Sequence, residues 1–197
     1  MISNPVYKDL LKLGLVNKDE IQIISKKTRD IEMPVYIDKK SGIIFLERHE
    51  MPVNYYQENA SGNPKEPYFL ENGYYPDDLR RFNQFKDYIS KAEYLLDFGC
   101  EWGGFLNLAN NECKKISGIE LNNNCLGYLK NKFPNSNFFN NLDEVPSPDL
   151  ITCFHVFEHI PEQLKLLKKF KNKLEYGGTL ILEVPHAKDF LIQSIEL

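Results

Sequence analysis

The chain has 197 residues, of which 42% are hydrophobic and 26% are charged, and its formal net charge at pH 7 is −4. This composition is that of an ordinary soluble globular protein, and the length suits one domain with an appendage. The acidic balance gives no electrostatic footprint for nucleic acid or an anionic membrane, so neither is expected as a partner, although a local basic patch stays open.

The four cysteines are widely spaced and include no Cys-x-x-Cys pair. They predict reduced, apolar side chains rather than disulfides or a metal site. The N-terminus carries no apolar segment of the secretory kind, and no later run reaches membrane-spanning length. We accordingly expect the protein to stay in the cytoplasm.

Short elements alternate in residues 1–75, which we predict to be a small N-terminal α+β extension. The pattern predicts a helix over 5–13 and two strands over 34–37 and 43–46 that form a hairpin. Residues 54–78 are polar and aromatic. A long loop of this composition is either a lid or disordered, and the alternative is that its tyrosines pack the extension against the rest of the chain.

From residue 76 onwards, apolar strands alternate with helical patterns. This alternation predicts a doubly wound α/β domain over 76–197, with a mostly parallel sheet covered on both faces. Strands are expected at 94–98, 116–120, 137–139, 149–154 and 179–183, and helices at 77–89, from Phe105, at 121–133, and from Pro161 to the Gly177-Gly178 pair.

The strand over 94–98 runs into a glycine turn, Gly99-Cys-Glu-Trp-Gly103. Glycine permits a sharp turn, and the free N–H groups at the start of the following helix can hold a nucleotide-like ligand. In a dinucleotide-binding turn the middle glycine lets the backbone approach a pyrophosphate. Here Glu101 occupies that position, which opposes a diphosphate but suits a ligand with a positive sulfonium. Glu120, about 20 residues beyond the turn, is placed to bind a ribose hydroxyl pair, so we predict an adenosine-type ligand without phosphates.

Three motifs occur in order, namely Leu95-Leu-Asp-Phe-Gly-Cys-Glu-Trp-Gly-Gly-Phe-Leu106, Gly118-Ile-Glu120 and Asp149-Leu-Ile-Thr-Cys-Phe-His-Val-Phe-Glu-His-Ile-Pro161. Together they resemble the class I S-adenosylmethionine-dependent methyltransferases. The third motif and Leu182-Glu-Val-Pro-His186 further resemble bacterial enzymes that methylate sugars and surface-polysaccharide precursors. The resemblance implies a Rossmann-like fold, S-adenosyl-L-methionine as cofactor and S-adenosyl-L-homocysteine as product. One departure is Glu101, which replaces a glycine of the family and bears on the path of the methionine tail.

The resemblance also implies which residues contact the cofactor. Asp97 and the turn would hold its amino-acid end, Glu120 its ribose, and residues just beyond the third strand its adenine edge, with Asp143 as an alternative there. For Asp97 the other interpretation is a carboxylate that braces the loop, and for Glu120 a solvated acid at a strand end. The cofactor-binding residues expected are Asp97, Gly99, Cys100, Glu101, Gly103, Glu120, Leu121, Asn141, Leu142 and His155.

Two histidines follow the strand over 149–154 at its carboxyl end, where open parallel sheets bind their ligands. His155 and His159 are four residues apart and would share one face if this segment were helical, with Glu158 beside them. An imidazole can act as a general base near neutral pH, and the resemblance favours His159 for that role. The alternatives are that Glu158 and His159 only brace the loop or bind a metal, and no metal is expected here. His186, at the end of the next strand, is a third catalytic candidate, with a turn residue as its alternative.

The predicted reaction is methyl transfer to a small polar acceptor, a nucleotide-linked sugar or a capsule or lipopolysaccharide precursor. The alternatives are a methyltransferase of a quinone or another small metabolite, and a non-catalytic partner subunit that binds the cofactor. The family's sheet normally continues beyond the strand over 179–183 with a helix and a terminal pair of strands. We therefore expect a fragment that is incomplete at its C-terminus and poorly active alone, and we leave a homodimer open.

Overall fold

The structure, a computed structural model, describes residues 2–28, 31–49, 57 and 73–186. Contacts between residues divide the chain into two units. The first unit comprises residues 1–51, 158–166 and 184–197, and the second comprises residues 52–157 and 167–183. Within the described ranges, no helix combines the length and the apolar character that crossing a membrane requires. The lid-like loop predicted within 54–78 lies largely outside the described residues.

The first unit contains helix α1 and a three-stranded antiparallel sheet in the order β1-β2-β3. The start of α1 (Pro5–Lys12) is fixed by the Asn4 side chain, which accepts a hydrogen bond from the Val6 N–H. β2 (Val35–Asp38) pairs with β3 (Ile44–Leu46), so the predicted helix and hairpin are confirmed. β1 (Ile21–Ser25) directly follows the 3₁₀ turn η1 (Lys18–Glu20) and adds a third strand that was not predicted.

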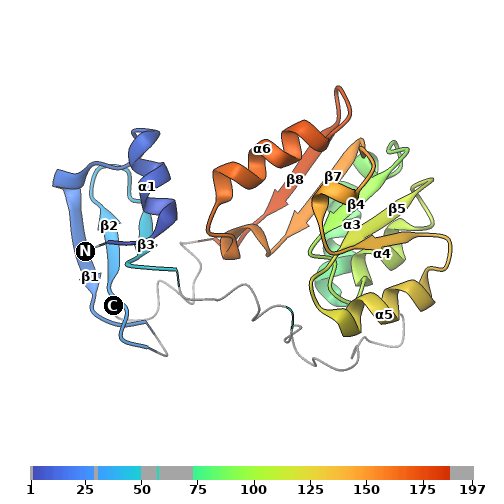
Figure 1. Cartoon of the computed structure of the whole chain (residues 1–197), viewed down its shortest axis with the longest axis horizontal. Helices are drawn as coiled ribbons and strands as arrows, with labels where there is room; N and C mark the ends of the chain where they lie inside the picture. The colour runs from blue at the N-terminus through green and yellow to red at the C-terminus, as the bar shows by residue number, and fades with distance from the viewer. Residues whose placement is uncertain (1, 29–30, 50–56, 58–72, 187–197) are drawn as a thin grey trace. The chain divides into compact units, whose positions relative to one another are not determined.

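The second unit is built on a five-stranded parallel sheet in the order β6-β5-β4-β7-β8 (Figure 1). β4 lies at the centre, and the chain winds outward from it in both directions. This order confirms the predicted doubly wound α/β fold. The strands are β4 (Leu95–Phe98), β5 (Ile116–Ile119), β6 (Asn137–Phe139), β7 (Leu150–Phe154) and β8 (Thr179–Glu183).

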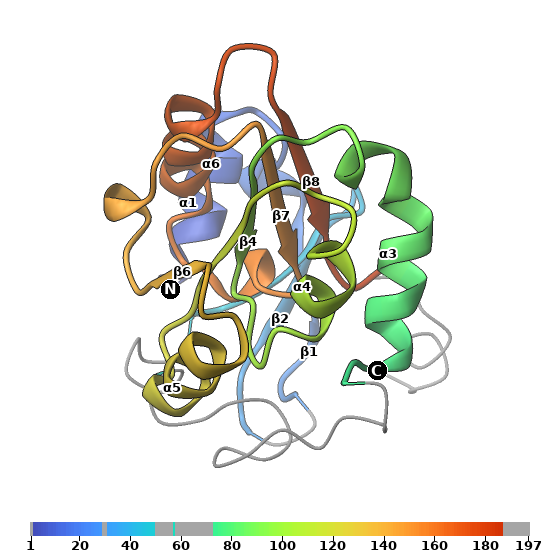
Figure 2. The same ribbon diagram turned by 90° about the vertical axis from the view of Figure 1, so that its right-hand side faces the viewer.

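Side chains from helices bury both faces of this sheet. Phe82 and Leu129 join the strand residue Leu95 in one core cluster. Phe98 lies three residues further along the same strand and therefore faces the other way, where the Phe170 ring packs edge-on against it at 5.0 Å. Figures 1 and 2 show α3 and α4 side by side. The helices are α3 (Pro76–Ile89), α4 (Gly104–Ala109), α5 (Asn123–Lys132) and α6 (Gln163–Lys173).

The last helix begins later than predicted. Its first backbone hydrogen bond joins the Leu166 N–H to the Glu162 carbonyl, so Pro161 precedes the helix instead of opening it.

The predicted strand over 149–154 and the helix over 77–89 are confirmed as β7 and α3 to within one residue at each end. Within α3 the Leu79 side chain is exposed, whereas Asp78 is buried. The burial of Asp78 is explained by its ion pair with Arg81 of the same helix.

Candidate functional site

The sharp turn that the glycines predicted after β4 is confirmed, and two of its glycines have a left-handed backbone. Gly99 and Gly103 have φ angles of 80° and 75°. A Cβ added to Gly99 would lie 2.3 Å from Val156 Cγ2, and one added to Gly103 would lie 2.5 Å from Leu129 Cδ2. Both glycines are therefore required by conformation and by space. Gly99 brings the turn against the segment that follows β7, and Gly103 brings it against α5.

Glu101 occupies the turn position where a glycine was expected, and its backbone is left-handed like that of the neighbouring glycines. Its φ angle is 48°, in the left-handed region, which costs a non-glycine residue roughly 1–2 kcal/mol. Its N–H donates a 2.9 Å hydrogen bond to Glu120 Oε2, which helps to hold this conformation. Having glutamate instead of glycine at position 101 therefore adds a side chain to the turn, while the backbone keeps the positive φ that a glycine would adopt.

Glu120 follows β5 and is mostly buried. Its carboxylate accepts backbone hydrogen bonds from Glu101, from Leu121 at 2.7 Å and from Asn122 at 2.9 Å. Burial raises the pKa of Glu120 in spite of these three bonds. Glu120 is thus a bracing acid that ties the glycine turn to the start of α5, rather than a solvated acid at a strand end. Two carboxylate oxygens provide about four acceptor positions, so this bracing leaves capacity for a ligand.

A pocket opens at the carboxyl end of β4, with an empty volume of about 400 Å³ that includes space open to solvent. Four predicted cofactor residues line it, namely Asp97, Gly99, Cys100 and Glu101. The other six do not line it, namely Gly103, Glu120, Leu121, Asn141, Leu142 and His155. The remaining lining residues were not predicted as site residues, and they are Tyr75, Asp78, Arg81, Trp102, Gly104, Phe105 and Phe154.

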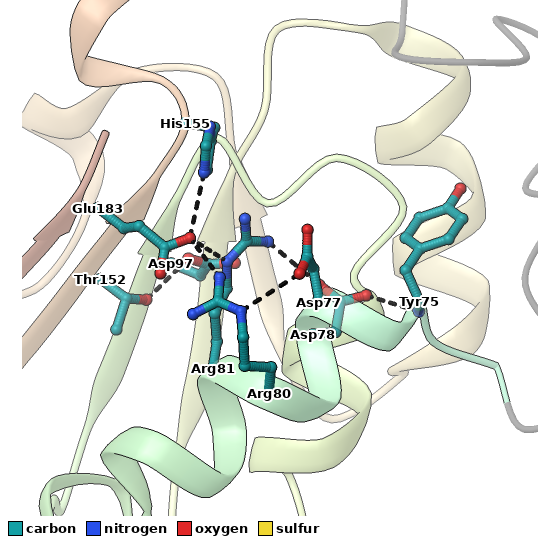
Figure 3. Close-up of polar contacts among 9 residues, drawn as sticks. All are labelled: Tyr75, Asp77, Asp78, Arg80, Arg81, Asp97, Thr152, His155 and Glu183. Atoms are coloured by element: carbon teal, nitrogen blue, oxygen red, sulfur yellow. Dashed lines mark hydrogen bonds and ion pairs between the residues drawn. The ribbon is translucent and has the colours of Figure 1, made fainter. Parts of the chain in front are cut away.

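Asp97 is the most deeply buried acid of this pocket, with 4% of its surface exposed. Thr152 Oγ1 of the neighbouring β7 donates a 2.7 Å hydrogen bond to Asp97 Oδ1 (Figure 3). Burial raises the pKa of Asp97 to about 7, although the Thr152 hydroxyl opposes the shift. At neutral pH the carboxyl is therefore poised between its two protonation states.

Replacing Thr152 by valine is expected to destabilise the fold by about 1–2 kcal/mol, and by more at pH 8.5 than at pH 5.5. The folded-state pKa of Asp97, about 7, lies above its ordinary value of 3.8. The contribution of Asp97 to the free energy of unfolding is therefore complete at low pH, and it is lost as the pH rises through about 7. Removing the hydroxyl affects mainly the ionised form. Urea unfolding at both pH values, with Thr179→Val in β8 as the matched control, measures this. Equal losses at both pH values would contradict it.

Two residues on the first turns of α3 bring charge to the pocket. Asp78 accepts the Tyr75 N–H at 2.9 Å, and its carboxylate lies 3.8 Å from Arg81 (Figure 3). The Arg81 guanidinium lies 5.2 Å from the centre of the Phe154 ring. These residues were missed because α3 was interpreted only as an amphipathic covering helix. The adjacent charges of Asp77-Asp78 and Arg80-Arg81 on it were the available signal.

The segment after β7 is not the continuous helix on which a shared face of two histidines depended. His155 has a left-handed φ of 54°, and the only helical turn in this segment is η3 (Phe157–His159), a 3₁₀ turn. A left-handed residue breaks the helical path, so the condition under which His155 and His159 would share one helical face is not met. His155 instead faces the end of β8, with its Nε2 3.1 Å from Glu183 Oε1.

The other predicted catalytic residues belong to the first unit. His159 Nε2 lies 3.8 Å from Glu158 Oε1, and the His159 carbonyl lies 2.9 Å from His49 Nε2. His186 is exposed. Glu158, His159 and His186 therefore keep their catalytic roles as proposals.

The predicted adenine-binding residues lie beyond β6, at the start of the 3₁₀ turn η2 (Leu142–Glu144). The Asn141 side chain caps this turn by accepting the Asp143 N–H at 3.0 Å, and Leu142 is buried. Asn141 is exposed at this edge of the sheet. The cap explains why an asparagine is found here, and its role toward adenine stays a prediction.

Similar structures include an S-adenosylmethionine-bound amino pentose methyltransferase from Micromonospora echinaspora, DesVI from Streptomyces venezuelae and the N-methyltransferase NodS from Bradyrhizobium japonicum with S-adenosyl-L-homocysteine. Their sequence identities to this chain are 20%, 20% and 18%, and their TM-scores are 0.48, 0.46 and 0.47. The matches cover 56%, 55% and 61% of this chain and 50%, 49% and 67% of the respective structures. The chain thus spans about half the length of the first two.

Comparison with curated protein sequences gave no match. A family model described as a methyltransferase domain matches residues 69–197, which include the glycine turn, Glu120 and all five strands of the parallel sheet. Because this match covers well over half of the chain, the chain belongs to the methyltransferase domain family, as its three motifs predicted.

Proposed function

We propose that this chain binds S-adenosyl-L-methionine at the turn after β4 and forms part of an enzyme that transfers the methyl group to a small polar acceptor. One observation carries the proposal. Among the residues that the structure describes, three acids, Asp78, Asp97 and Glu101, and one cation, Arg81, line the pocket beside the turn. Buried carboxylates attract a cation and repel a diphosphate. The sulfonium and ammonium of the cofactor meet this requirement, whereas a dinucleotide does not.

The residues at the carboxyl ends of β4, β5 and β6 match successive parts of this ligand, from its methionine tail to its adenine. Asp97 would pair with the ammonium group, and Arg81 would pair with the carboxylate of the methionine tail. The turn from Gly99 to Gly103, with Cys100 and Glu101, would lie against that tail. Glu120 and Leu121 would bind the ribose. At the next strand end, Asn141 and Leu142 would read the adenine edge.

When bound, the sulfonium supplies an activated methyl carbon, so the protein has mainly to align the acceptor and exclude water. The acceptor class that the sequence resemblance favours is a nucleotide-linked sugar or another surface-polysaccharide precursor. Glu158, His159 and His186 are the proposed acceptor-side residues. Incubating the full-length protein with methyl-labelled cofactor and nucleotide-linked sugars tests this. Label transfer to a quinone instead would overturn the acceptor class but not the reaction.

Calorimetry with S-adenosyl-L-homocysteine tests the cofactor site. We expect binding whose affinity falls as the pH drops below about 7, because the ammonium pairs with ionised Asp97 and a proton must then be released. Asp97→Asn is expected to weaken binding at pH 8 by roughly tenfold or more and to remove this pH dependence.

Asp77→Asn is the matched control, since the Asp77 side chain is 69% exposed and pairs with Arg80. This variant is expected to bind like the unmodified chain. If the unmodified chain bound no S-adenosyl-L-homocysteine at any pH, or if Asp97→Asn bound it equally well, the proposed site would be wrong.

A further inference from the structure

We propose that Glu183 is a positioning residue for Arg81. It holds the Arg81 guanidinium by its Nε and thereby directs both Nη atoms toward the carboxylate of the methionine tail. This inference rests on the proposed function, in which Arg81 pairs with that carboxylate. It gives Glu183, at the end of β8, a part in cofactor recognition although it does not line the pocket.

The Glu183 side chain connects β8 to α3. Arg81 Nε donates a 2.7 Å hydrogen bond to Glu183 Oε1, and Arg80 Nη2 donates to the same oxygen at 2.8 Å (Figure 3). The side chains of Arg81 and Glu183 are only 13% and 18% exposed, so solvent screens this ion pair little. Burial opposes ionisation of Glu183, but the hydrogen bonds from Arg80 and Arg81 outweigh it and lower its pKa to about 2. Glu183 is therefore an anion at neutral pH and holds Arg81 there.

The hydrogen bond at Nε fixes which part of Arg81 reaches the pocket. A guanidinium is a rigid planar fork with N–H groups on Nε and on both Nη atoms. Arg81 Nη1 lies 3.8 Å from Asp78 Oδ1, and the guanidinium carbon lies 5.2 Å from the centre of the Phe154 ring. Asp78 and Phe154 both line the pocket, whereas Glu183 does not. The Nε edge is thus bound outside the pocket, and the Nη atoms are presented to a ligand within it.

Asp78 competes with a ligand for the same Nη atoms. Its carboxyl is buried and lines the pocket, and burial raises its pKa. The 3.8 Å separation from Arg81 Nη1 is longer than a hydrogen bond, so the two groups interact by charge alone. Without Glu183, the Arg81 guanidinium would be free to turn onto Asp78. Glu183 therefore keeps an acid of the site from occupying the donors that the ligand requires.

Charge attraction and positioning predict opposite effects of removing Glu183. Without its negative charge the surroundings of Arg81 become more positive, and Coulomb attraction alone would strengthen binding of a carboxylate. Loss of the held orientation would weaken binding, because the donors would have to be ordered when the ligand binds. The direction of the change in affinity therefore separates the two effects.

Calorimetry with S-adenosyl-L-homocysteine on the whole chain measures this direction. Glu183→Ala is expected to weaken binding about tenfold, and Glu183→Gln, which keeps an acceptor oxygen without the charge, about threefold. In the Arg81→Met background, Glu183→Ala is expected to cause no further loss, because a residue that acts through Arg81 has no effect once Arg81 is replaced. The analogue of the ligand that lacks the carboxylate is expected to bind Glu183→Ala as well as it binds the unmodified chain.

Glu93→Ala is the matched control. Glu93 also pairs with a basic side chain, that of Lys114, but it is 68% exposed and does not line the pocket. This variant is expected to bind like the unmodified chain. Unchanged or tighter binding in Glu183→Ala would overturn the inference. A further loss in the Arg81→Met background, or an equal loss with the carboxylate-free analogue, would overturn it as well.

A second measurement needs no ligand. Nitrogen-15 NMR, assigned with Arg81→Met, follows the exchange of the Arg81 Nε–H with water. We expect this exchange to be about tenfold faster in Glu183→Ala than in the unmodified chain, because the accepting oxygen is lost. Equal exchange rates would refute the hold of Glu183 on Arg81. If the unmodified chain bound no S-adenosyl-L-homocysteine, the cofactor site would be wrong while the exchange rates would still decide whether Glu183 holds Arg81, so the two failures are distinguishable.

Discussion

Replacing Gly99 by alanine is expected to destabilise the fold by about 3 kcal/mol and to abolish binding of S-adenosyl-L-homocysteine. The φ of 80° alone disfavours alanine by roughly 1–2 kcal/mol. The new Cβ would also lie 2.3 Å from Val156 Cγ2 and 3.2 Å from both its Cβ and its Cγ1. A β-branched side chain has few rotamers, so no rotation of Val156 makes room and the turn has to move. Urea unfolding and calorimetry measure the two losses.

Gly177→Ala is the matched control for this substitution. Gly177 has the same φ of 80°, but a Cβ built there meets nothing within 4 Å. We therefore expect only the conformational cost, about 1 kcal/mol, and unchanged ligand binding. If the two variants lost equal stability, contact between the turn and Val156 would not be what constrains Gly99.

Replacing Arg81 by methionine is expected to weaken S-adenosyl-L-homocysteine binding by roughly 10- to 100-fold. Arg81 lines the pocket, its side chain is 13% exposed, and its guanidinium can form charge-assisted hydrogen bonds with a carboxylate. The same variant is expected to bind the analogue of this ligand that lacks the carboxylate as well as the unmodified chain does. Calorimetry with both ligands measures the difference.

Arg80→Met separates recognition of the ligand from support of the fold. Arg80 donates to the same Glu183 oxygen as Arg81 but does not line the pocket. Both variants therefore lose an ion pair with Glu183, and only Arg81→Met is expected to lose affinity. If Arg81→Met weakened binding of both ligands equally, Arg81 would support the site without contacting the carboxylate.

Local patterns in the sequence were enough to predict the parallel sheet. The apolar runs that became β4 and β7, and the alternation of strand with helix, require little more than periodicity. The glycine turn was equally predictable. Only glycine fits a position with a φ of 80° next to Val156, so the glycine at position 99 marks the turn in the sequence. By contrast, β1 was missed, since its pairing with β2 depends on contacts that no local pattern expresses.

The amino-acid sequence by itself determined the doubly wound sheet and the turn at Gly99, because backbone preferences and hydrophobic periodicity act between near neighbours in the chain. The methyltransferase family was likewise determined by the sequence, through its three motifs. Only the tertiary structure brought Arg81 of α3 into the pocket and placed His155 against Glu183, 28 residues further along. Charges recruited from separate elements depend on how those elements pack. The tertiary structure also decided that Asp97, an ordinary acid in the sequence, has its pKa raised to about 7, since burial and not residue type sets that value.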